Sequence, residues 1–121
     1  MKGYRDLQVW QKAMDLVIDV YRATQSFPSH ELYGLTSQMR RAAVSMPSNL
    51  AEGHGRNSPR EFLVFIGHAR GSLCELETHI EISTRLGYFG EAMAAKLAAS
   101  ISEIARMLNG LREWSLPAGA Q

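Results

Sequence analysis

The sequence predicts an all-α fold, an antiparallel up-down-up-down four-helix bundle that forms a single domain over residues 1–121. Four segments carry apolar residues at alternating spacings of three and four, which is the period of an α-helix. No segment shows the apolar–polar alternation that is typical of a half-buried strand. Short turns containing glycine or proline separate the four segments, and a chain of 121 residues is long enough for one core.

The first expected helix covers residues 7–24. Its apolar stripe consists of Leu7, Trp10, Met14, Val17 and Tyr21. We expect this stripe to face the core and Asp6 to serve as the N-cap. Pro28 prevents any continuation of the helix.

The second expected helix covers residues 35–53 and contains a proline. Its expected core face consists of Leu35, Met39, Ala42, Ala43, Met46 and Leu50. Pro47 removes one backbone hydrogen bond and crowds the carbonyl of Ala43, so it favours a bend, for which Ser45 and Ser48 can supply replacement hydrogen bonds. The alternative is a helix that breaks and restarts with Pro47 in its first turn.

The third expected helix covers residues 59–86 and follows the turn GHGRN. Ser58 is expected as N-cap, Pro59 as the first helical residue and Glu61 as the partner that closes a capping box. Gly87 is the expected C-terminal cap. Its core stripe is Phe62, Ile66, Ala69, Leu73, Leu76, Ile80 and Ser83.

Two glycines, Gly67 and Gly71, lie inside this third helix and permit close approach of a neighbouring helix or of another subunit.

The fourth expected helix covers residues 91–113. Its stripe is Met93, Leu97, Ile101, Ile104, Leu108 and Leu111.

A second stripe on the 35–53 helix is polar and flanks the core face at roughly 110° instead of lying opposite to it. It contains short side chains, so we expect half-buried groups that need hydrogen-bond partners. Arg41 and Glu52 are too far apart to pair within one helix, which leaves another helix or another subunit as the source of their partners. We favour a network near a subunit contact, built from Arg41, Ser45, Asn49 and Glu52.

The familiar enzyme motifs of helical bundles are missing from the sequence. It contains no Glu-x-x-His pairs for a di-iron site, no CxxCH for haem attachment and no HExxH for zinc. Glu75 and His79 stand four residues apart and are expected to be surface neighbours, and the remaining histidines are expected at solvent or at an interface. We therefore expect no catalytic residue, no metal, no cofactor and no enzymatic activity.

The location expected from the sequence is the cytoplasm. The N-terminus MKGYRDLQVWQK lacks an apolar signal region, and no apolar run approaches the roughly 20 residues that span a bilayer. Cys74 is the one cysteine, and we expect it to be a buried free thiol.

Basic residues concentrate in the middle of the chain although the net charge is only +1. Residues 33–74 carry five arginines against two glutamates, whereas residues 75–103 carry five glutamates against one arginine and one lysine. Arg56 and Arg60 flank the start of the third helix, where phosphate binds favourably. We expect sequence-independent contacts with a nucleic-acid backbone from Arg40, which should be free to meet solvent, and from Arg56, Arg60 and Arg70.

Several stretches resemble one known family: LQVWQKAMDLVIDVYRAT, FP, ELYGLTSQMRRAAVSMPSNLAEGHGR, EFLVFIGHARGSLCELET and the closing LGY. This is the four helix bundle protein family, whose members are also described as proteins encoded by the intervening sequence of bacterial 23S ribosomal RNA genes. The resemblance runs from Leu7 to Tyr88. The matched family positions are Arg41, Ser45, Pro47, Ser48, Asn49, Glu52, Gly53, Arg56 and Glu61.

This resemblance implies a left-handed antiparallel bundle that assembles into a closed homopentamer. It also implies similarity to the accessory variability determinant of diversity-generating retroelements, a basic pentameric bundle that binds nucleic acid and a reverse transcriptase. The present chain departs from that relative in being nearly neutral.

Two functions are therefore expected. The first is an oligomeric module that binds RNA or DNA through the backbone. The alternative is a structural assembly that binds a protein partner, such as a reverse transcriptase, and makes no nucleic-acid contact of its own.

Overall fold

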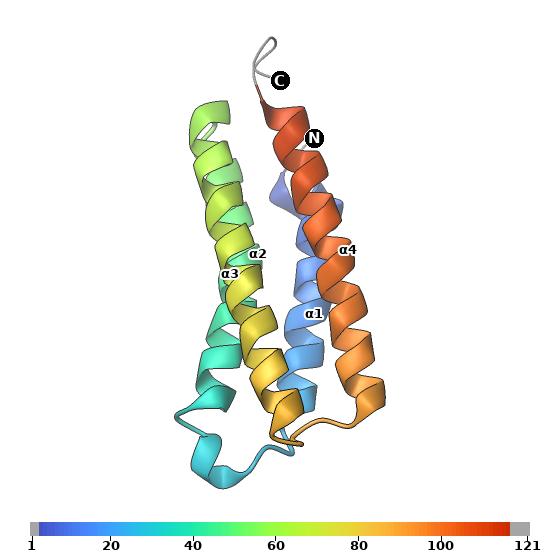
Figure 1. Cartoon of the computed structure of the whole chain (residues 1–121). Helices are drawn as coiled ribbons and strands as arrows, with labels where there is room; N and C mark the ends of the chain where they lie inside the picture. The colour runs from blue at the N-terminus through green and yellow to red at the C-terminus, as the bar shows by residue number, and fades with distance from the viewer. Residues whose placement is uncertain (1–2, 117–121) are drawn as a thin grey trace.

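The computed structural model describes residues 3–116. Its four α-helices are α1 (Gln8–Thr24), α2 (Leu35–Gly55), α3 (Pro59–Arg85) and α4 (Glu91–Ser115), and two short 3-10 helices, η1 (Tyr4–Asp6) and η2 (Ser29–Glu31), precede α1 and α2. No strand occurs between residues 3 and 116. The connections between helices alternate between the two ends of the molecule: α1–α2 and α3–α4 are joined at one end, and α2–α3 at the other (Figure 1). Helices that follow one another in sequence are therefore antiparallel. The predicted all-α four-helix bundle is confirmed.

Three of the four predicted core stripes are confirmed. All seven residues of the α3 stripe are buried. In α2 the buried members are Met39, Ala42, Ala43, Met46 and Leu50, with Leu35 packed against them. In α4 they are Leu97, Ile101, Ile104 and Leu108, with Met93 and Leu111 packed against them.

The predicted orientation of α1 is wrong. Met14 and Tyr21 are exposed, Trp10 is half-buried, and the buried residues of the helix are instead Val9, Ala13, Leu16, Val17, Val20, Ala23 and Thr24. Both stripes have the helical spacing, and they share Val17. Leu7, which directly precedes the helix, is buried as predicted. The stripe that faces the core has the smaller side chains, which lets α1 approach its neighbours closely and leaves the bulkier stripe toward solvent.

The helix ends follow the predicted capping chemistry in two places. The Ser58 hydroxyl accepts a hydrogen bond from the Glu61 amide at 3.3 Å, at the start of α3, so Ser58 is the N-cap as predicted. The Glu61 carboxylate pairs with Arg56 and does not close the predicted capping box. Gly87 has a φ of 77°, and the Gly87 and Tyr88 amides donate to the carbonyls of Thr84 and Ser83 at 3.0 and 2.9 Å. These two bonds form a Schellman motif at the end of α3.

Asp6 does not cap α1, because the chain enters this helix through η1, whose last residue is Asp6. The N-cap residue is Leu7. The prediction of Asp6 as N-cap is therefore wrong.

Helix α2 runs without interruption through the buried Pro47, so the alternative of a break and restart is wrong.

Close packing against α3 occurs at Gly53, where an added Cβ would collide with the Cβ of Phe65. A Cβ built on Gly67 or Gly71, in contrast, would meet no atom of a neighbouring helix within 4 Å, so these glycines do not serve close approach within the described residues. None of the described helices is long and apolar enough to cross a bilayer.

Candidate functional site

One member of the predicted polar network, Ser45, joins α2 to α3, and a second member, Asn49, bonds to Ser45 within α2. The hydroxyl oxygens of Ser45 and Ser72 lie 2.8 Å apart. The Asn49 amide group donates to the Ser45 carbonyl at 2.8 Å and to the Ser45 hydroxyl at 3.0 Å. This part of the network lies within one chain.

The other two members, Arg41 and Glu52, do not join it. Glu52 accepts a hydrogen bond at 3.1 Å from Arg56, four residues further along the chain, so its partner is not on another helix as expected. The reason is that α2 continues to Gly55 and brings Arg56 one turn beyond Glu52. Arg41 is exposed, not half-buried, and makes no hydrogen bond or ion pair with another described residue.

Arg40 was expected to face solvent freely, and this prediction is wrong. Its Nε donates to the hydroxyl of Thr24 at 2.8 Å, and its Nη2 donates to the Tyr21 carbonyl at 3.4 Å. The guanidinium also lies 4.6 Å from the centre of the Tyr21 ring. Arg40 therefore donates hydrogen bonds to the last turn of α1, where the helix dipole favours a cation.

Arg56 is also held by neighbouring groups. Its guanidinium lies 3.1 Å from Glu52, 3.8 Å from Glu61 and 5.3 Å from the centre of the Phe65 ring. The two carboxylates offset its charge, and Glu61 pairs with Arg56 in addition to offering its amide to Ser58.

Arg60 and Arg70 remain available for an external partner. Both side chains are exposed on α3, and neither forms an ion pair within residues 3–116. Arg60 is the second residue of the helix, directly after Pro59. Of the four arginines that the sequence suggested, these two have an unpaired charge among the described residues.

Two further sequence predictions fail. Cys74 is exposed, although a buried thiol was expected. His79 is buried, although a surface position was expected, and its Nδ1 has no hydrogen-bond partner among the described residues. His79 lies beside the apolar stripe of α3 and not opposite to it. The buried face of α3 is therefore broader than the apolar stripe alone indicated.

The bulky stripe of α1 forms an exposed apolar surface together with α2. We call this surface the α1–α2 face and define it by Trp10, Met14, Ile18, Tyr21 and Val44. A groove of about 330 Å³ runs along part of it, lined by Tyr4, Trp10, Met14, Val17, Val44, Pro47, Ser48 and Ala51. The helical spacing of Trp10, Met14 and Tyr21, which was interpreted as a core stripe, is the sequence signal for this surface.

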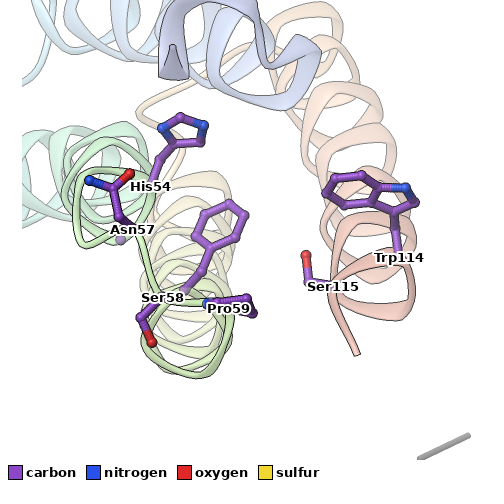
Figure 2. Close-up of a pocket in the computed structure, with 8 residues that line it drawn as sticks. His54, Asn57, Ser58, Pro59, Trp114 and Ser115 are labelled. Carbon is purple, nitrogen blue, oxygen red and sulfur yellow. The ribbon is translucent and has the colours of Figure 1, made fainter. Parts of the chain in front are cut away.

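A second hollow, the end cleft, lies between the start of α3 and the end of α4 and has a volume of about 490 Å³ (Figure 2). The α2–α3 side contributes Gly53, His54, Asn57, Ser58, Pro59 and Phe62, and α4 contributes Trp114 and Ser115. The Trp114 side chain is 76% exposed, and the buried Ser115 hydroxyl has no hydrogen-bond partner among the described residues. Sequence reasoning missed this cleft because its two sides lie far apart in the chain.

A comparison with protein families decides the classification of the chain. The model of the 23S rRNA-intervening sequence protein family matches residues 5–110. The chain belongs to this family. The resemblance inferred from the motifs is thereby confirmed, and the match includes the α1–α2 face but ends before Trp114. No curated protein matches the chain. Among the described residues of this family member, no group of three or more His, Cys, Asp or Glu side chains could hold a metal ion.

Proposed function

We propose that this chain is a non-catalytic assembly module of the cytoplasm, and that its α1–α2 face is covered by another copy of the same chain. The observation that carries the proposal is the run of large apolar side chains on α1. Met14, Ile18 and Tyr21 follow one another at spacings of four and three, so they lie on one face of the helix and form a continuous strip.

Exposed apolar residues are ordinary when they are scattered, and a contiguous patch is what marks an interaction surface. Met14 of this strip lines the groove together with the exposed Val44 of α2, so the α1–α2 face extends over both helices. Aromatic residues and methionine are enriched in protein interfaces, and Trp10, Met14 and Tyr21 are of these types. The homopentamer implied by the family resemblance agrees with a face that needs a partner chain.

The experiment compares two isoleucine variants of similar exposure. Ile18 on the α1–α2 face is 46% exposed, and Ile82 on α3 is 42% exposed. We expect Ile18→Lys to lower the mass measured by light scattering toward the 13.5 kDa of one chain, because a lysine in the contact must be desolvated. Ile82→Lys should keep the mass of the wild-type protein.

Two results would count against this role. The wild-type protein could have the mass of one chain at every micromolar concentration tested. Alternatively, Ile82→Lys could dissociate the assembly while Ile18→Lys leaves it intact, which would place the contact elsewhere.

Binding of a nucleic-acid backbone is a second candidate function, and Arg60 and Arg70 favour it because they are exposed and lack acidic partners in the described chain. A closed ring would repeat these charges and raise the avidity for one strand. Labelled RNA and DNA should then bind in low salt and dissociate as salt rises.

Matched arginine variants test this second candidate. Arg60→Ala with Arg70→Ala should weaken binding, whereas Arg85→Ala should not, because Arg85 is already paired with Glu81 at 2.8 Å. If neither nucleic acid binds in low salt, the chain has only the assembly role and contacts with protein partners.

A further inference from the structure

A groove between α3 and α4, distinct from the α1–α2 face and from the end cleft, combines apolar residues with charged groups of opposite sign. We call it the α3–α4 groove. Its volume is about 270 Å³, close to the lower end of the roughly 300–1,000 Å³ that is typical of ligand pockets. Leu73 and Ile101, both buried, and the half-buried Ala105 form its apolar part. The polar residues of the lining are therefore the groups that select a ligand.

The two charged residues of the lining, Arg70 and Glu77, both belong to α3 and stand seven positions apart. Ion pairs within a helix form at spacings of three or four, and a spacing of seven separates the two residues by about 10 Å along the helix axis. Both side chains are exposed, and neither has an ion-pair or hydrogen-bond partner among the described residues. The α3–α4 groove therefore presents a cation and an anion that do not pair with each other.

The α4 side of the groove adds a hydrogen-bond donor near the cation. Because α3 and α4 are antiparallel, Asn109, the last lining residue of α4, lies toward the Arg70 end of the groove (Figure 1). The Asn109 side chain makes no hydrogen bond with another described residue, and its amino group can donate. A guanidinium beside an amide donor favours a carboxylate, whereas the Glu77 carboxylate at the other end favours an ammonium group.

The spacing of these end groups decides between classes of ligand. A nucleic-acid strand offers phosphates to Arg70 but no cation to Glu77. A single amino acid carries its two charged groups on the same carbon, so they are too close together to reach both ends of the groove. An extended peptide spans at most about 3.3–3.6 Å per residue, so three residues separate their charged ends by about 10 Å. A tripeptide with free ends therefore matches the separation of Arg70 and Glu77.

We propose that the α3–α4 groove binds a short peptide of about three residues through both of its free ends. The C-terminal carboxylate pairs with Arg70 and Asn109, the N-terminal ammonium group pairs with Glu77, and the chain between them lies along Leu73 and Ile101. This site goes beyond the assembly role and does not depend on it, because the groove belongs to α3 and α4.

The assay uses Cys74, the one cysteine of the chain, which is exposed and lines the α3–α4 groove. A bound peptide should cover the thiol, so trialanine should slow the alkylation of Cys74 by iodoacetamide in a saturable manner. The dependence of the rate on peptide concentration gives the affinity. Dialanine is too short to reach both ends and should bind more weakly, and tetra-alanine should bind no more tightly than trialanine.

Capped peptides and matched variants assign the two ends. Amidation of the C-terminus or acetylation of the N-terminus removes one charge and should weaken binding about two- to five-fold, the range that an exposed ion pair supplies. Arg70→Ala should weaken the binding of trialanine by a similar factor and leave the affinity of the amidated peptide nearly unchanged. Glu77→Gln should behave in the same way toward the acetylated peptide. Arg60→Ala is the control and should bind trialanine like the wild-type protein, because Arg60 is an exposed arginine of α3 that does not line the groove.

The proposal is overturned if millimolar trialanine leaves the alkylation rate of Cys74 unchanged, or if trialanine capped at both ends protects Cys74 as well as the free peptide does. Light scattering on the same samples reports the assembly separately, so failure of the peptide site is distinguishable from failure of the assembly proposal.

Discussion

The substitution Gly53→Ala tests the packing of α2 against α3. Gly53 is buried, and a Cβ built on it would collide with the Cβ of Phe65 and lie 3.0 Å from the Phe65 Cγ and 3.1 Å from the Phe62 Cδ1. The Phe65 Cβ is bonded directly to the α3 backbone, so rotation of the side chain cannot move it away. Relief of the collision requires α2 and α3 to separate.

The magnitude follows from two opposing effects. Overpacking of a core costs roughly 1–3 kcal/mol, and alanine gains about 1 kcal/mol over glycine in a helix interior. Because the colliding atom is close to the backbone, the cost should lie in the upper part of its range, so we expect a net loss of about 1–2 kcal/mol. For a chain of 121 residues this corresponds to a melting temperature lower by roughly 4–8 °C.

The matched control is Gly110→Ala in α4. No atom lies within 4 Å of a Cβ at Gly110, so this variant should gain up to about 1 kcal/mol. Urea denaturation of both variants at one fixed protein concentration gives the two free energies of unfolding. If Gly53→Ala were as stable as Gly110→Ala, the close contact between α2 and α3 would be refuted.

Three smaller predictions concern single contacts. Ser58→Ala should cost about 1 kcal/mol of unfolding free energy in urea, because it removes the cap of α3. In a double-mutant cycle, Ser45→Ala and Ser72→Ala should show a coupling of about 0.5–1.5 kcal/mol, and additive effects would contradict their hydrogen bond. The Tyr88 hydroxyl donates to Glu31 at 2.9 Å, and this bond raises the Tyr88 pKa above 10.0. The bond therefore stabilises the fold below pH 10 and is lost as the pH rises through the raised pKa, so Tyr88→Phe should remove this part of the pH dependence of the melting temperature.

Much of the fold followed from the sequence because most of its signals are local and agree with one another. The α3 stripe from Phe62 to Ser83 has a single set of apolar positions, so its orientation is unambiguous. The Ser58 cap and the Gly87 motif depend on residues a few positions apart, which makes them readable from short stretches. The orientation of α1 was ambiguous because two of its apolar stripes have the helical spacing. Contacts with the other helices determine which of the two stripes is buried.

The candidate sites were less predictable because they depend on contacts between distant segments. Arg40 contacts Thr24 and Tyr21 on another helix, which no spacing within α2 could show. The pairing of Glu52 with Arg56 required α2 to extend two residues beyond the predicted end, from 53 to Gly55. The end cleft exists only where the ends of three helices meet.

Hydroxyl-radical footprinting of the wild-type protein tests most directly whether another copy covers the α1–α2 face. Modification of Met14 and Tyr21 should be slower in the wild-type protein than in the dissociated Ile18→Lys variant, because the assembly excludes solvent from both side chains. Tyr33, which is 91% exposed and lies outside the α1–α2 face, serves as the control and should react equally in both proteins. Equal modification of Met14 and Tyr21 in the two proteins would contradict the account.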